Sequence, residues 1–208
     1  MHDATPRPAA AALRLADVSR EFGGVHALSR LTLEVEPGTV YGVIGPNGAG
    51  KTTLFNVITG VYPASSGHLY VDDVDITRLS PLRVARLGIS RTFQNIHVFS
   101  GMSVLDNVLL GQSRLTPSGL RSLMPFTADR RERALVADAF EVLELLGLHG
   151  FANASATDLP YALQRRVEIA RALAARPRLI LLDEPAAGLN EEESLHLTRD
   201  ILRLPERG

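Results

Sequence analysis

The feature that most constrains this chain is a glycine-rich segment matching Gly-x-x-x-x-Gly-Lys-[Ser/Thr], namely Gly45-Pro46-Asn47-Gly48-Ala49-Gly50-Lys51-Thr52-Thr53. Its Lys51 is the only lysine among 208 residues, whose other basic side chains are arginines and histidines. Glycines allow successive backbone N–H groups to turn inward around an anion, and a helix that starts where the loop ends adds its positive dipole end. The segment therefore predicts a phosphate-binding loop.

The residues on both sides of the loop have the pattern that such a loop requires. Residues 39–44 read as a buried strand, and residues 52–59 read as a helix that Gly60 ends. Lys51 supplies a compact charge for β- and γ-phosphates, and the Thr52 hydroxyl is a Mg²⁺ ligand. The predicted nucleotide contacts are Gly45, Asn47, Gly48, Ala49, Gly50, Lys51, Thr52 and Thr53.

Composition excludes several other classes of function. A formal net charge of −1 provides no basic field for nucleic acid, so we expect no nucleic-acid partner. The absence of cysteine excludes disulfides and thiolate metal sites, and the six histidines show no metal-ligand spacing. No apolar run approaches the roughly 18 residues that a membrane span needs. We therefore expect a soluble chain whose membrane role, if any, comes through a partner.

The order of the remaining patterns predicts an α/β fold. Short strands at 13–18 and 31–35 precede the strand at 39–44, which favours an antiparallel subsheet beside a parallel core. Strands are also expected at 68–71, 89–93 and 179–182, and a short helix is expected from Pro81 to Gly88. Helical patterns fill residues 103–164, with Ser103 and Asp106 as a capping box and a long helix at 127–146. Further helices are expected at 163–175 and after Asn190, with Glu193 completing a second capping box.

The apolar run at 179–182 ends in two adjacent acids, Asp183 and Glu184. Acids at a strand end are common turn residues, but beside a phosphate loop they form the second half of a nucleotide site. Asp183 would hold Mg²⁺ through its water shell, and Glu184 would orient or deprotonate the attacking water.

Taken together, these motifs resemble the ATP-binding cassette (ABC) family over nearly the whole chain. Gln94, in Arg91-Thr92-Phe93-Gln94, matches the family's glutamine that ligates Mg²⁺ and senses the transporter interface. Residues 187–190 match the loop that communicates across the family's dimer, and Phe22 matches the aromatic on which adenine stacks. The resemblance implies ATP and Mg²⁺ as cofactors, with Lys51, Gln94 and Glu184 as catalytic residues and with Thr52, Gln94 and Asp183 as metal ligands.

The resemblance also implies an architecture. We expect a P-loop NTPase core with a mixed or parallel sheet, an N-terminal antiparallel β-subsheet and a helical insertion subdomain. The whole chain, 1–208, would be one ABC ATPase domain, with 13–95 and 165–208 forming the ATP-binding core and 96–164 the helical subdomain.

Within the family, the runs at 91–95, 104–108, 164–173 and 183–190 look like the ATPase subunit of branched-chain amino acid uptake systems. Ala186-Ala187 is the most telling pair, because most cassette ATPases carry Thr-Ser or Thr-Asn-His there. This resemblance implies integral membrane permease subunits and a second ABC ATPase subunit as partners. It also implies a cytoplasmic location, peripheral on the inner face of the cell membrane.

Two departures leave an alternative open. The family signature Leu-Ser-Gly-Gly-Gln, which meets the γ-phosphate of the opposite subunit, corresponds to Leu159-Pro160-Tyr161-Ala162-Leu163. Pro160 has neither the serine hydroxyl nor an N–H, Ala162 adds a methyl group where the backbone approaches phosphate, and Leu163 removes the amide. The family also continues beyond Gly208 into a strand and a histidine, so the domain is expected to be C-terminally incomplete. The alternative is a truncated or degenerate module that binds ATP with little hydrolysis. A ribosome- or DNA-acting cassette and a small-molecule kinase match the sequence less well.

Overall fold

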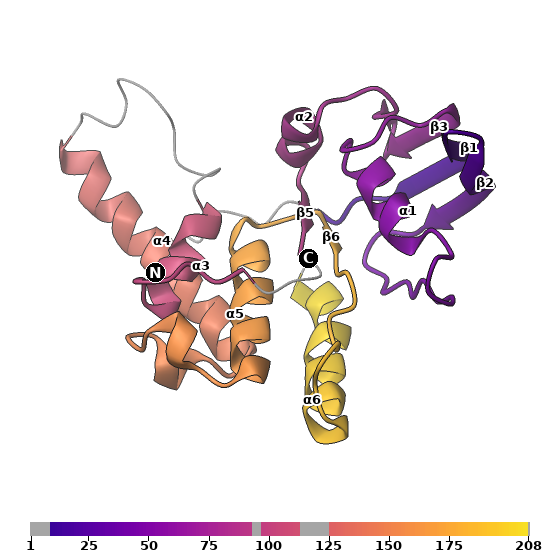
Figure 1. The fold of residues 1–208 in the computed structure, drawn as a ribbon. Helices are drawn as coiled ribbons and strands as arrows, with labels where there is room; N and C mark the ends of the chain where they lie inside the picture. Colours follow the sequence, from indigo (N-terminus) through magenta and orange to yellow (C-terminus); the bar gives the residue numbers. More distant parts are fainter. Residues whose placement is uncertain (1–8, 93–96, 113–124, 208) are drawn as a thin grey trace.

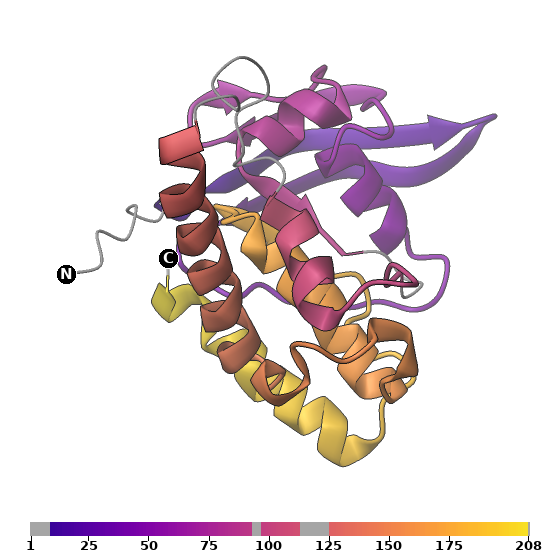
Figure 2. The same cartoon turned by 90° about the vertical axis from the view of Figure 1, so that its left-hand side faces the viewer.

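The computed structural model describes residues 9–92, 97–112 and 125–207, which form an α/β molecule with a sheet at one end and helices at the other (Figure 1). The short parallel strands β5 (Ile89–Arg91) and β6 (Leu179–Leu181) lie between the two ends. Seen from the helical side (Figure 2), α4 (Pro125–Leu145) lies in front and the antiparallel sheet lies behind.

The N-terminal antiparallel subsheet is confirmed. Its four strands are β1 (Leu13–Phe22), β2 (Val25–Val35), β3 (Ser66–Val71) and β4 (Val74–Asp75), in the order β2-β1-β3-β4. β1 and β2 run several residues beyond their predicted ends because the Gly23-Gly24 turn joins them into one hairpin, and both glycines have positive φ. β5 and β6 pair in parallel, with Arg91 opposite Leu181.

The strand predicted at residues 39–44 is wrong, because the structure assigns no strand there. A β-strand exists only where a neighbouring strand accepts its hydrogen bonds. In this structure a cavity separates the segment from β6, and the side chain of Ile44 is 95% exposed. The apolar residues that look like a core strand in the sequence therefore line an open groove.

The predicted helices are confirmed, with shifts of up to two residues at some ends. α1 (Lys51–Ile58) follows the phosphate loop, and α2 (Pro81–Arg86) begins after Ser80. α3 (Val104–Gly111) and α6 (Glu191–Leu202) both start with the predicted capping boxes. The remaining helical elements are α4, α5 (Tyr161–Ala174) and the 3₁₀ turns η3 (His149–Phe151), η4 (Ala156–Asp158) and η5 (Leu204–Arg207).

Buried side chains form two hydrophobic clusters. One joins the antiparallel sheet to α1, α2, β5 and β6, and the other joins α3, α4 and α5 to Leu197 of α6. Within the described ranges, no helix has the length and apolar character needed to cross a lipid bilayer.

Candidate nucleotide site

The phosphate loop takes a shape that strongly favours glycine at two positions. Gly48 and Gly50 have φ angles of 83° and 86°, in the left-handed region. A Cβ atom on Gly50 would lie 2.3 Å from the carbonyl oxygen of Ala27 in β2, so the loop rests directly on the antiparallel sheet. α1 then begins without a side-chain cap and without an acidic residue in its first turn. Such a helix start suits an anion.

Lys51 lies over the loop that precedes it. Its Nζ atom donates hydrogen bonds to the carbonyl oxygens of Gly45 at 2.7 Å and of Pro46 at 3.0 Å. Asn47, Gly48, Ala49 and Thr52 are exposed, so a ligand can reach them from solvent. The loop thus presents one flexible cation, backbone N–H groups and a hydroxyl at one place.

Asp183 lies just after β6, and its side chain is buried and paired. Nη2 of Arg91 donates to Oδ2 of Asp183 at 3.0 Å, and Nη1 of Arg91 donates to Oδ1 of Asn56 in α1 at 2.6 Å. The backbone N–H of Asp183 donates to the Thr92 hydroxyl at 3.3 Å. Arg91 therefore ties the predicted metal ligand to the helix that follows the phosphate loop.

The role of Arg91 was missed from the sequence, because it depends on the register between two strands that lie far apart in the chain. In the parallel register Arg91 lies opposite Leu181, two residues before Asp183. An arginine and an aspartate that leave the same edge of neighbouring parallel strands are well placed to pair.

Glu184 differs sharply from its neighbour, because its side chain is exposed and its backbone has a φ of 45°. Its carbonyl oxygen accepts hydrogen bonds from Nη2 of Arg165 at 2.9 Å and from the N–H of Ala187 at 3.0 Å. A left-handed conformation costs a non-glycine residue about 1–3 kcal/mol and persists only where surrounding contacts hold it.

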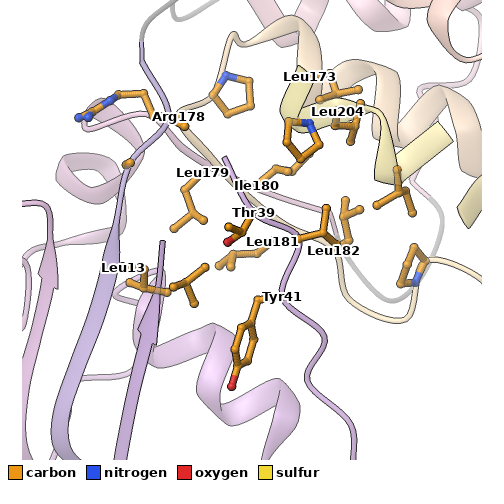
Figure 3. A pocket seen from close by; sticks show the side chains of 18 of the residues that line it. Leu13, Thr39, Tyr41, Leu173, Arg178, Leu179, Ile180, Leu181, Leu182 and Leu204 are labelled. Carbon is orange, nitrogen blue, oxygen red and sulfur yellow. The ribbon is translucent and has the colours of Figure 1, made fainter. Parts of the chain in front are cut away.

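A cavity of about 470 Å³ lies between residues 39–44 and 179–184 (Figure 3). The close-up shows Leu179, Ile180, Leu181 and Leu182 near Thr39 and Tyr41. Lys51, Asp183 and Glu184 also line it, so the two halves of the predicted site share one cavity. Most of its wall is hydrocarbon, which makes the cavity itself unsuitable for a triphosphate.

Phe22 stands at the end of β1 as part of an aromatic group. Its ring is 39% exposed, and its centroid lies 5.2 Å from that of Tyr62 at an interplanar angle of 78°. The guanidinium carbon of Arg20 lies 4.3 Å from the Phe22 centroid. The sequence did not predict that Tyr62 and Arg20 belong to this group, because only the fold brings them next to the Phe22 ring. An exposed aromatic of this kind can stack on a base.

The segment in the place of the family signature leads into α5. Pro160 is the N-cap residue and provides no side-chain cap, while its carbonyl accepts from the N–H groups of Leu163 and Gln164. The Tyr161 ring lies against Gly188, where a Cβ atom would be 2.9 Å from Cε1 of Tyr161. The start of α5 therefore contacts the loop that follows Glu184.

Gln94 lies outside the described residues. Across the residues that the structure does describe, no group of three or more histidine, aspartate or glutamate side chains could by itself hold a metal ion. A Mg²⁺ site made by Thr52 and Asp183 would need ligand oxygens from a bound triphosphate, which is how such ions are usually held.

Comparison with known proteins places these features in context. Residues 28–187 match the ABC transporter family. The chain is 43% identical to the high-affinity branched-chain amino acid transport ATP-binding protein BraF of Pseudomonas aeruginosa, over 92% of this chain and 76% of that protein. It is 41% identical to the LivG protein of the same description from Escherichia coli K12, over 88% of this chain and 72% of the relative.

Solved structures give the same result. An ATP-binding cassette of an ABC transporter, crystallised in its ADP conformation, superposes with a TM-score of 0.81 and 36% identity, covering 95% of this chain and 78% of that one. A bacterial ABC transporter cassette solved as a dimer superposes with a TM-score of 0.75 and 26% identity, covering 93% and 83%. The predicted fold class is therefore confirmed.

Proposed function

The chain belongs to the ABC transporter family, and we propose that it is the ATP-hydrolysing subunit of an importer of branched-chain amino acids. The observation that carries the proposal is the 43% identity to a branched-chain amino acid transport ATP-binding protein over 92% of the chain. Proteins of this family couple ATP hydrolysis to transport. That relationship favours the transport ATPase over the alternative of a degenerate nucleotide-binding module.

The contacts of the phosphate loop support ATP as the ligand. Asn47, Gly48 and Ala49 of the loop are exposed, and α1 starts without a competing cap or carboxylate. Lys51 now donates to the Gly45 and Pro46 carbonyls, and we expect it to transfer those hydrogen bonds to phosphate oxygens. Phe22, with Tyr62 and Arg20 beside it, offers the stacking surface for adenine.

We assign the chemistry at the γ-phosphate to Glu184, and we assign Gln94 as a second catalytic residue. The Glu184 carboxylate is exposed beside the cavity that Lys51 also lines. From there it would orient the attacking water and accept its proton. Bound Mg²⁺ would neutralise charge on the β- and γ-phosphates, and Thr52, Gln94 and Asp183 are its proposed ligands. Asp183, which pairs with Arg91 in this structure, would hold the ion through its water shell.

The assembly follows from the same relationship. ABC cassettes dimerise, as the similar solved dimer illustrates. We propose that this chain pairs with a second ABC ATPase subunit and docks on integral permease subunits at the cytoplasmic face of the membrane, with no nucleic-acid partner. The proposed division of labour within the chain is an ATP-binding core at 13–95 and 165–208 and a helical subdomain at 96–164.

One pair of variants tests the site assignment. Lys51→Ala removes the only lysine of the chain, so we expect tight Mg-ATP binding to be lost. Glu184→Gln keeps the shape of the side chain but cannot accept a proton, so we expect binding to be retained and turnover to fall by about 10²–10⁴-fold. Nucleotide titration and steady-state phosphate release measure the two effects. Unchanged affinity in Lys51→Ala would contradict the phosphate site, and unchanged turnover in Glu184→Gln would remove Glu184 as the base.

A further inference from the structure

A buried ion pair on α5 reaches the backbone of the proposed catalytic glutamate. The side chains of Arg165 and Glu168 are each only 1% exposed, and Nη1 of Arg165 donates to Oε2 of Glu168 at 2.9 Å. Nη2 of the same guanidinium donates to the carbonyl oxygen of Glu184 at 2.9 Å. One buried cation therefore joins the helix after the signature segment to the residue after Asp183.

Stability alone is a weak reason to bury this pair. Moving two charges out of water carries a large desolvation cost, and well-packed apolar replacements of a buried ion pair are often neutral or stabilising. A second reason for the Arg165–Glu168 pair lies in the direction that it gives to the Arg165 guanidinium. Glu168 fixes one edge of the guanidinium, which leaves another N–H aimed at the Glu184 carbonyl.

The conformation of Glu184 is one that needs such an anchor. Its φ of 45° lies in the left-handed region, which L-residues other than glycine adopt only when other contacts hold them. The hydrogen bond from Arg165 holds the carbonyl toward the protein, while the carboxylate stays exposed beside the cavity. Rotation of this peptide unit would change the backbone torsions of Glu184 and therefore the direction of its side chain.

We propose that Arg165, held by Glu168, is a positioning residue that fixes the Glu184 backbone and so aims its carboxylate at the γ-phosphate. The inference rests on the proposed function, since it concerns the same carboxylate. A second contact supports the path, because the Tyr161 ring on α5 lies against Gly188 in the same loop. A movement of α5 would therefore reach the loop through two contacts, one at Glu184 and one at Gly188.

The test replaces both partners at once, Arg165→Met with Glu168→Leu, so that neither charge of the buried pair is left without the other. We expect the double variant to fold and to bind Mg-ATP with its affinity within about twofold of the parent. We expect kcat to fall about 10- to 100-fold at little-changed KM, because a misplacement of about 1 Å can cost that much. Amide exchange across residues 184–190 should accelerate, since the carbonyl anchor is gone.

Arg166→Met is the matched control on the same helix. Arg166 forms an ion pair with Asp200 at 3.0 Å and donates to the Leu146 carbonyl at 2.6 Å, and neither partner is in the Glu184 loop. We expect this variant to leave kcat and exchange at 184–190 unchanged. If the double variant fails to fold, Arg165→Lys is the second test, because it keeps a positive charge beside Glu168. A single ammonium group does not reproduce the two directed guanidinium hydrogen bonds, so amide exchange at 184–190 should still be faster than in the parent. Parent-like exchange in a folded Arg165 variant overturns the proposal.

Combining the double variant with Glu184→Gln separates this inference from the proposed function. If Arg165 acts through Glu184, the combined variant turns over no more slowly than Glu184→Gln alone. If Glu184→Gln alone is inactive while the Arg165 and Glu168 replacements leave kcat intact, positioning is refuted and the catalytic glutamate stands. If Glu184→Gln remains fully active, the base assignment itself fails, and the positioning role fails with it.

Discussion

At the scale of single residues, the site depends on backbone conformations that side chains alone do not reveal. Gly48 and Gly50 share a left-handed φ, yet their surroundings differ. A Cβ atom on Gly50 would meet the Ala27 carbonyl oxygen at 2.3 Å, whereas nothing lies within 4 Å of one on Gly48. Substituting each glycine in turn therefore separates the energetic cost of a left-handed backbone from the cost of a steric clash.

We expect Gly48→Ala to lower the free energy of unfolding by about 1–2 kcal/mol, the usual cost of the left-handed region for alanine. Gly50→Ala carries the same strain and also pushes the phosphate loop off β2. It should therefore destabilise the protein by at least twice as much and weaken ATP binding. Chemical denaturation with nucleotide titration measures both effects. Equal losses in the two variants would contradict the close approach of Gly50 to Ala27.

Among the structural elements, the turn between β3 and β4 is tied to the N-terminus and to the start of β6. Oδ1 of Asp72 accepts from the Ala12 N–H at 3.0 Å, and Nη2 of Arg178 donates to Oδ2 of Asp72 at 2.6 Å. Nε of Arg178 in turn donates to the Ala9 carbonyl at 2.9 Å. These contacts connect the antiparallel sheet to the segment that leads into the parallel strands.

This connection predicts a change in acid stability. The Ala12 N–H, and after it the Arg178 guanidinium, hold the pKa of Asp72 below its ordinary value of 3.8, although burial opposes the shift. A lowered pKa in the folded state stabilises the protein above pH 3.8, and this stabilisation is lost as the pH falls through the folded-state pKa. Asp72→Asn should therefore be less stable than the parent at pH 5, and the difference should shrink below pH 3.8. A constant difference across this range would show that the charge of Asp72 does not contribute.

The elements also show which parts of the fold a sequence can predict. Both capping boxes are local signals within four residues of chain, and both were predicted correctly at Ser103 and Asn190. The segment at 39–44 has strand-like side chains, but a strand depends on a neighbour distant in sequence. Among the described residues, no strand pairs with this segment, and a cavity lies between it and β6. The contacts of Arg91 with Asp183 and of Arg165 with Glu184 span 92 and 19 residues, and no local pattern specifies either.

At the scale of the whole molecule, the start of α5 is the feature that bears on assembly. In the ABC family the signature segment meets the γ-phosphate bound by the opposite subunit, so each complete site requires two chains. Here Pro160, the second residue of that segment, is the N-cap of α5, and Tyr161 is exposed. Pro160 and Tyr161 are exposed, but the segment carries fewer groups that could donate to a phosphate oxygen.

We therefore expect ATP turnover per chain to be low and to rise with protein concentration, because dimerisation completes the site. Changing Pro160→Ser, Ala162→Gly and Leu163→Gln together restores the donors, so turnover at equal concentration should increase by up to about 10²–10³-fold, the effect of one transition-state hydrogen-bond donor. Affinity for ATP at the chain's own phosphate loop should change little, because Lys51 and its loop are untouched. The same triple change in a Glu184→Gln background serves as the control and should remain inactive. Turnover per chain that is independent of concentration and unaffected by the triple change would show that one chain completes the site alone.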